Sequence, residues 1–307
     1  MLRWSFSPPV DLHKPFGSLK RVNRSGHAGK SMAERMNGRS EDMGSTEVSL
    51  HTIQQQLNGF VSTNPKNVVA ELDMMQIYDQ PLLGVANAED TLWKKLKEPD
   101  VIDPLHLSPT EWLSGAKSVI SCFLPFTERI RSANRSEGWP ATEWLYGRYE
   151  GEMFSNAVRC YLVEILQRLS GHAVAPALDV RFAVVQRRSN WSERHVAFIA
   201  GLGTFSLNRS LITNQGSAGR FVSVVTDLAL EPTPRPYSEV DEYCTKCGAC
   251  ILRCPPLAID KNGKDNAICS LYVRETEVRY KPRIGCGKCQ TGVPCEARRP
   301  PASTATV

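Results

Sequence analysis

Apolar residues recur with helical spacing in three parts of the chain. After Ser49, four of them lie three or four positions apart and therefore share one helix face: Leu50, Ile53, Leu57 and Phe60. A longer helix is predicted over 152–170, ended by Gly171, because its apolar residues form a stripe: Met153, Phe154, Ala157, Val158, Tyr161, Leu162, Ile165, Leu166 and Leu169. A third helix is predicted over 193–202, ending at Gly201 or Gly203.

Short apolar runs predict buried strands at 117–126, which Pro125 ends, at 179–185 and at 220–230. Helices and strands therefore mix, and we expect an α+β or α/β fold. No run approaches the ~18–20 apolar residues that a membrane span requires. We expect a soluble, cytoplasmic protein that does not enter a membrane.

Three prolines within residues 231–236 predict a connector, because proline fixes the backbone and removes a hydrogen-bond donor. The predicted division is a disordered extension over 1–45, an α/β cofactor or substrate domain over 46–236, a ferredoxin-like module over 237–300 and a tail over 301–307. The extension is rich in Arg, Ser and Gly. It could instead be a transit peptide, or lie upstream of a later start at Met32, Met36 or Met43.

The positive charge is concentrated in that extension. The whole chain carries a formal charge of +5, but residues 1–40 hold eight Lys and Arg against two acidic residues, a net of +6. The remaining 267 residues therefore sum to −1. A nearly neutral folded part argues against a nucleic-acid partner.

The cysteines indicate metal chemistry, because eight of the ten fall between Cys244 and Cys295. The first four read C-x2-C-x2-C-x3-C-P, which is the pattern that ligates cubane iron–sulfur clusters in bacterial ferredoxins. In that pattern the last cysteine ligates a second cluster. Thiolates suit iron because they are soft, charge-donating ligands.

Counting the cysteines gives two sets of four, each enough for one [4Fe–4S] cluster. The first set comprises Cys244, Cys247, Cys250 and Cys295. The second comprises Cys254, Cys269, Cys286 and Cys289. A zinc ribbon is the alternative for the first run, and a single cluster with Cys269 and Cys295 idle is the alternative for the second. Cys122 and Cys160 lie in a predicted strand and helix, and we expect both to be inert core.

The segment 190–220 combines polar side chains with glycine-dense turns at Gly201-x-Gly203 and at Gly216-x-x-Gly219. The polar run from Trp191 to His195 has two interpretations. It is either a capped helix start, with Ser192 as the cap, or the polar lining of a cofactor or substrate pocket. In the second interpretation Glu193, Arg194 and His195 are the candidates for proton transfer or substrate contact.

Over roughly residues 70–300 the chain resembles epoxyqueuosine reductase and its relatives. The resemblance rests on the cysteine module, on the turn Ala200-Gly201-Leu202-Gly203, on the loop 216–220 and on the segment 109–126. It implies a corrinoid-binding α/β domain joined to a two-cluster ferredoxin module. It also implies that Cys269 is a ligand, and that Gly201 and Gly203 lie near a cofactor such as cobalamin.

Two features depart from that family. Its enzymes carry an acidic proton donor about thirteen residues before the glycine turn, whereas residues 185–189 here contain no acid. Five residues also separate Cys289 from Cys295, where the family has three followed by C-P. Both departures argue against tRNA as the substrate.

We therefore expect an iron–sulfur oxidoreductase that receives electrons from a ferredoxin or flavodoxin and passes them to a cofactor or small-molecule substrate in the α/β domain. One alternative is an electron carrier without catalysis that docks to a partner oxidoreductase. Another is an epoxyqueuosine reductase acting on tRNA. The sequence names neither the substrate nor the oligomeric state.

Overall fold

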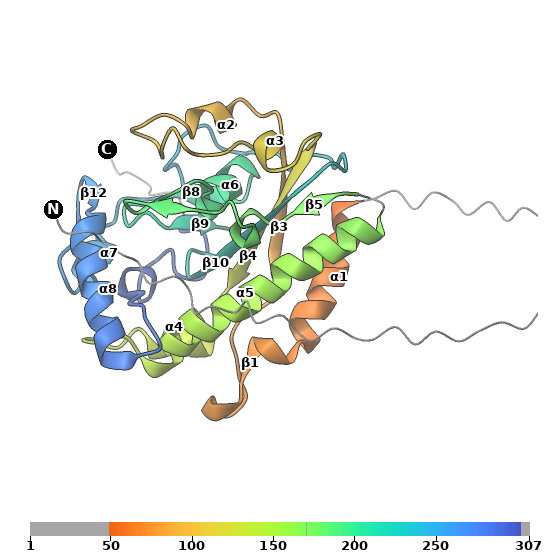
Figure 1. Ribbon diagram of the computed structural model, residues 1–307. Helices are drawn as coiled ribbons and strands as arrows, with labels where there is room; N and C mark the ends of the chain where they lie inside the picture. Colours follow the sequence, from red (N-terminus) through yellow and green to blue (C-terminus); the bar gives the residue numbers. More distant parts are fainter. Residues whose placement is uncertain (1–48, 170, 302–307) are drawn as a thin grey trace, which may run out of the picture. The chain divides into compact units, whose positions relative to one another are not determined.

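The computed structural model describes residues 49–169 and 171–301, and these residues belong to one compact unit. The predicted extension over 1–45 and the tail beyond residue 301 lie outside the described residues. The described part is a mixture of helices and strands, as predicted (Figure 1). The boundary that we place at residues 231–236 stays a prediction.

A four-stranded antiparallel sheet forms the centre of the fold. Its strand order is β3 (Leu82–Asn87), β4 (Ser118–Pro125), β10 (Gly219–Thr226) and β5 (Ala173–Val174). Every residue of β4 is buried, and its pairing with β10 runs from Ser118 opposite Thr226 to Pro125 opposite Gly219. The strands predicted over 117–126 and 220–230 are confirmed, although β10 begins one residue earlier and ends at Thr226.

Helices cover both faces of this sheet. On one face lie α1 (Leu50–Thr63) and α5 (Thr142–Arg168), side by side in Figure 1, and their apolar residues share a core with β4 and β10. On the other face lies α6 (Glu193–Ile199). The Ser49 hydroxyl accepts a hydrogen bond from the N–H of Thr52 and so caps the N-terminus of α1.

The long helix begins ten residues before the predicted start. Its first half lacks an apolar stripe because two glycines take the place of core side chains. A Cβ on Gly147 would lie 2.8 Å from the Ile130 side chain, and one on Gly151 would lie 2.5 Å from the Tyr78 hydroxyl. Met153, assigned to the buried stripe, is instead half exposed.

The strand predicted over 179–185 is wrong. A 3-10 turn, η3 (Pro176–Leu178), precedes it, and the Asp179 carboxylate then accepts hydrogen bonds from the backbone and guanidinium of Arg181. This local turn competes with extended structure. Only β6 (Val184–Val185) is extended, pairing with β7 (Arg188–Ser189) across a two-residue turn.

The remaining elements of the described chain are short, apart from one helix. In order they are η1 (Pro65–Asn67), β1 (Val68–Val69), η2 (Ala70–Leu72), β2 (Met75–Gln76), α2 (Leu92–Lys95), α3 (Pro109–Trp112), α4 (Glu128–Ala133), β8 (Gly203–Phe205), β9 (Leu211–Thr213), α7 (Ala249–Leu252), β11 (Ile259–Asp260), β12 (Gly263–Lys264), α8 (Asn266–Tyr280) and η4 (Lys288–Gln290). Among the described residues, no helix combines the length and apolarity needed to cross a bilayer.

The cysteine-rich segment is fastened to the loop that follows α4. The Arg253 guanidinium donates to the carbonyl oxygens of Asn134 and Arg135 at 3.0 and 2.8 Å. The buried Lys288 ammonium donates to the carbonyl oxygen of Ser136 at 2.7 Å. Cationic side chains on carbonyl oxygens form strong hydrogen bonds, so these contacts join the cysteine segment to the helical layer.

Candidate functional site

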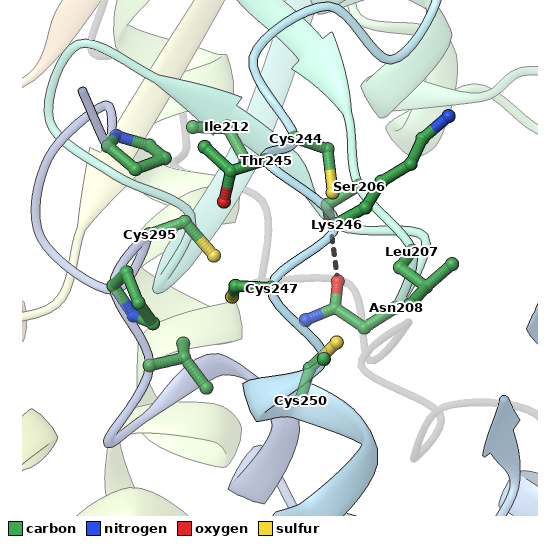
Figure 2. A pocket seen from close by; sticks show the side chains of 14 residues that line it. Ser206, Leu207, Asn208, Ile212, Cys244, Thr245, Lys246, Cys247, Cys250 and Cys295 are labelled. Carbon is green, nitrogen blue, oxygen red and sulfur yellow. Dashed lines mark hydrogen bonds between the residues drawn. The ribbon is translucent and has the colours of Figure 1, made fainter. Parts of the chain in front are cut away.

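Four cysteines surround one small pocket (Figure 2). They are Cys244, Cys247, Cys250 and Cys295, and they share the pocket wall with side chains of the loop 206–208. Cys247 is exposed, whereas the other three are half-buried. The structure thus brings Cys295 to the three cysteines with which the sequence analysis groups it.

Tight turns set the positions of these thiols. Lys246 and Gly248 both have left-handed backbones, with φ values of 53° and 76°, so the chain reverses between successive cysteines. Across the pocket, the Ser217 N–H donates to the Cys295 carbonyl oxygen at 2.9 Å. The buried Glu296 carboxylate next to it binds the Arg135 guanidinium at 2.6 Å, which fixes this end of the segment.

The other four cysteines line a second, much larger cavity of about 880 Å³. Cys254 follows α7, Cys269 lies on α8, Cys286 lies on the loop that leads into η4, and Cys289 lies within η4. Other parts of the wall come from the β6–β7 turn and the start of α6. A cavity of this size is in the range of small-molecule and cofactor sites.

The two cysteine groups are neighbours. Cys250 of the first group and Cys289 of the second pack against the same small core around Cys254 and Ile259. Asn208 lines both pockets, and its amide donates to the Cys289 carbonyl oxygen. The structure therefore places two four-thiol sites side by side, with Asn208 between them.

Burial and neighbouring thiols favour the protonated form of Cys250 and Cys286 when no metal is bound. Burial raises the pKa of Cys250 to about 12, and the nearby thiols of Cys289, Cys295 and Cys244 contribute to the rise. Burial likewise raises the pKa of Cys286 to about 12. A cation must displace these protons, so binding of metal here releases protons and is favoured by higher pH.

No three His, Cys, Asp or Glu side chains converge closely enough to hold a single metal ion anywhere in residues 49–169 and 171–301. The donor set nevertheless fits a larger inorganic group, because a cubane cluster separates its four thiolates more widely than one ion does. Four thiols per site is the number that a [4Fe–4S] cluster requires. Cluster ligation by these residues stays a prediction.

The predicted polar run at the start of α6 divides between two environments. Arg194 and His195 line the large cavity. Glu193 does not, because its carboxylate is buried against the Arg159 guanidinium at 3.1 Å and accepts a hydrogen bond from the Ser223 hydroxyl. Ser192 occupies the cap position, but its hydroxyl bonds the His195 ring nitrogen at 2.7 Å rather than the helix backbone.

The electrostatics of this run favour a neutral histidine. Burial, together with His106 and Arg194, lowers the pKa of His195 to about 3. The imidazole is therefore uncharged at neutral pH and suits hydrogen bonding to a ligand better than proton donation. Burial raises the pKa of Glu193 more than the Arg159 charge lowers it, so this carboxyl retains a proton more readily than a surface glutamate.

Neither Gly201 nor Gly203 lines the large cavity. Both are packed against protein backbone: a Cβ on Gly201, which has φ +78°, would lie 2.7 Å from the Pro234 carbonyl oxygen, and one on Gly203 would lie 1.9 Å from that of Ile212. The structure thus explains both glycines by close chain approach. Their predicted place near a cofactor stays a prediction.

Replacing Gly203 with alanine should lower the free energy of unfolding by about 1–3 kcal/mol, because the added methyl has no room beside the Ile212 carbonyl. Denaturant unfolding checks this. Gly59→Ala is the matched control, since its Cβ would meet open space on an exposed face of α1 and should stabilise the protein by about 0.5–1 kcal/mol. Equal effects of both changes would contradict the steric account.

Several site residues escaped the sequence analysis. Arg148, Arg187, Arg209 and Lys264 line the large cavity, yet they come from separate segments that only the fold brings together. Asn208 gave no signal because an asparagine in a turn is ordinary. Among the isolated cysteines, Cys122 is buried as predicted, but Cys160 is exposed, because it lies on the outer face of α5.

Asn208 should stabilise the turn that separates the two cysteine sites. It is almost fully buried, and its carbonyl oxygen accepts bonds from the Ser206 hydroxyl and the Ser210 N–H. Asn208→Ala leaves buried groups without partners and should cost about 1–3 kcal/mol of stability in urea unfolding. Asn262→Ala in an exposed turn should cost less than about 0.5 kcal/mol. Matching losses would rule out this role for Asn208.

The chain is similar in sequence to known proteins. No family model matches the chain. It is 26% identical over 246 residues to an epoxyqueuosine reductase from Bacillus anthracis, an alignment that covers 77% of this chain and 60% of that protein. It is also 26% identical over 210 residues to an epoxyqueuosine reductase from Bacillus subtilis, covering 64% and 52%. The chain thus spans only 52–60% of the length of these curated relatives.

The fold has a counterpart among solved structures. The structure of epoxyqueuosine reductase from Streptococcus thermophilus superposes with a TM-score of 0.50 at 17% identity, covering 82% of this chain and 68% of that one. At this level of identity the likeness concerns the fold. The chain is thus similar in sequence to epoxyqueuosine reductases and shares their fold.

Proposed function

We propose that the protein is an oxidoreductase that passes electrons through two [4Fe–4S] clusters to an acceptor in the large cavity. The observation that carries the proposal is the division of the eight cysteines: four surround the small pocket and the other four line the cavity. Four thiols per site match the ligand number of a cubane cluster. The epoxyqueuosine reductase relatives support an oxidoreductase.

The order of electron transfer follows from exposure. Cys247 of the first group is exposed, so an external donor such as a ferredoxin or flavodoxin would approach this edge. Cys250 and Cys289 pack against the same small core, so the path to the second cluster would be short. The second group opens on the cavity, where an acceptor would take the electrons.

A corrinoid is a suitable acceptor for this cavity. The cavity is large, it lies directly against Cys254 and Cys286, and His195 offers a neutral imidazole in its wall. These residues, with the turn at 186–188, would hold the group. When bound, a corrinoid supplies a cobalt centre that stores reducing electrons, while the protein supplies the polar wall.

Anaerobic purification with iron and sulfide analysis, followed by cobalamin titration in the visible spectrum, tests the proposal. About eight irons per chain and a stoichiometric spectral shift are expected. About eight irons with no cobalamin binding would leave electron transfer in place and remove the corrinoid. Stoichiometric zinc in place of iron would overturn the whole proposal. The carrier alternative, without catalysis, predicts that no small molecule enters the cavity.

Reduction of epoxyqueuosine in tRNA is the second candidate, because the curated relatives carry that name. The absence of an acid from residues 185–189 stands against it, because the family resemblance implies a proton donor in this region. Restoration of queuosine in cells that lack epoxyqueuosine reductase would establish this activity. A chain that loads its clusters but fails to restore queuosine would exclude it.

A further inference from the structure

The large cavity carries much more positive charge than the rest of the folded chain. Its charged wall residues are the acid Asp100 and six cations: Arg148, Arg187, Arg188, Arg194, Arg209 and Lys264. Residues 41–307 together sum to −1, so the surplus is local to this cavity. A concave wall of one sign focuses the field and attracts ions of the opposite sign.

Some of these cations have partners within the protein. The Arg188 guanidinium donates to the carbonyl oxygens of Pro99 and Ile102 at 2.8 and 2.9 Å, and it lies 3.6 Å from the Asp103 carboxylate. Lys264 lies near the second cysteine group and lowers the pKa of Cys254 and Cys289 against the effect of burial. These two residues have structural roles already.

Three other arginines of the cavity wall lack such partners within the described chain. Across the described residues, no side-chain hydrogen bond, ion pair or ring contact engages Arg187, Arg194 or Arg209. All three side chains are exposed in the cavity wall, so their guanidiniums are available to a ligand, and cations that line a concave wall attract anions.

The backbone holds two of these arginines in fixed positions. Gln186 and Arg187 form the β6–β7 turn with φ values of 49° and 67°, and Arg209 has φ 60° in the turn before β9. Left-handed backbone is costly for residues with a side chain, and such positions concentrate at functional sites. The second turn is also braced by Asn208 from within.

We propose that Arg187, Arg194 and Arg209 bind the phosphate or carboxylate groups of a small anionic ligand in this cavity. Guanidiniums are suited to such groups, because their N–H donors match two oxygens at once. The inference deepens the proposed function, since it names the chemical class of what lies beside the second cysteine group. A polynucleotide is less suitable, because the remaining folded surface is not basic.

The test uses the full chain, purified without oxygen and with its iron content measured. Isothermal titration with inorganic pyrophosphate should show saturable binding near one per chain. Arg187→Gln/Arg209→Gln should weaken it at least tenfold. Arg168→Gln, at the exposed end of α5, is the matched control and should leave binding unchanged. Circular dichroism of each variant verifies that it is folded.

The anion could belong to a substrate or to the phosphodiester of a corrinoid. Pyrophosphate that still binds after cobalamin is added supports a substrate, whereas its displacement assigns the arginines to the corrinoid. Unchanged binding in the double variant, or absence of binding to an iron-loaded chain, would overturn the anion site. Either result leaves the cluster proposal intact, because iron content is read independently in the same samples.

Discussion

Cys254→Ala is expected to halve the iron content, from about eight to about four atoms per chain, because it removes one of the four thiols that face the large cavity. Cys247→Ala should cause a loss of the same size at the other site. The two variants should differ in what remains. Electron paramagnetic resonance after dithionite reduction should show one cluster in each, with different spectra.

Cys160→Ala is the control, since this cysteine is exposed on α5 and belongs to neither group. It should retain the full iron content. The division of ligands between the two sites can be checked in the same way, because Cys295→Ala should resemble Cys247→Ala, and Cys289→Ala should resemble Cys254→Ala. Spectra that pair Cys295 with Cys254 would show the grouping to be incorrect.

Arg159→Met should lower the free energy of unfolding by about 3–5 kcal/mol, the loss typical when one partner of a buried ion pair is removed. The Arg159 side chain is only 4% exposed and bridges Glu152 on its own helix and Glu193 on α6, each at 3.1 Å. It therefore ties the helices on the two faces of the sheet. Guanidinium chloride unfolding measures the loss.

The loss should be larger at pH 8 than at pH 5. Burial already raises the pKa of Glu193, and removing Arg159 raises it further above the unfolded value. A carboxyl with a raised pKa costs stability as pH climbs through the window between the unfolded and folded values. The double variant Arg159→Met/Glu193→Gln removes the stranded charge and should recover part of the loss. A loss that is independent of pH would contradict this account.

Sequence patterns predicted those elements in which the apolar residues are the buried ones. The spacing of Leu50, Ile53 and Leu57 gives α1, and the mostly apolar sequence of β4 reflects burial on both faces. The first half of α5 was not predicted. Gly147 and Gly151 pack closely against the core without a side chain, so they add nothing to the apolar periodicity. The segment 179–185 misled because valines on an exposed turn look like strand residues.

The residues of the candidate site likewise include some that the sequence predicts and some that it does not. Counting ligands groups Cys295 with Cys244, because four thiols per cluster is a requirement that holds even for cysteines far apart in sequence. Nothing in the neighbouring sequence distinguishes Arg187 or Arg209 from ordinary surface arginines, because only the fold brings them to one cavity. The turn at Gly201 shows the reverse problem, because a glycine needed for chain packing looks the same as one needed for a ligand.

The pairing of β4 with β10 also bears on how the protein is made. These central strands are about a hundred residues apart in sequence, so the sheet cannot close until residue 226 has been synthesised. Contacts of such long range form slowly, and chains fold from the N-terminus during translation. All eight clustered cysteines come later, from Cys244 onward. Every strand of the central sheet is therefore synthesised before the first of these cysteines.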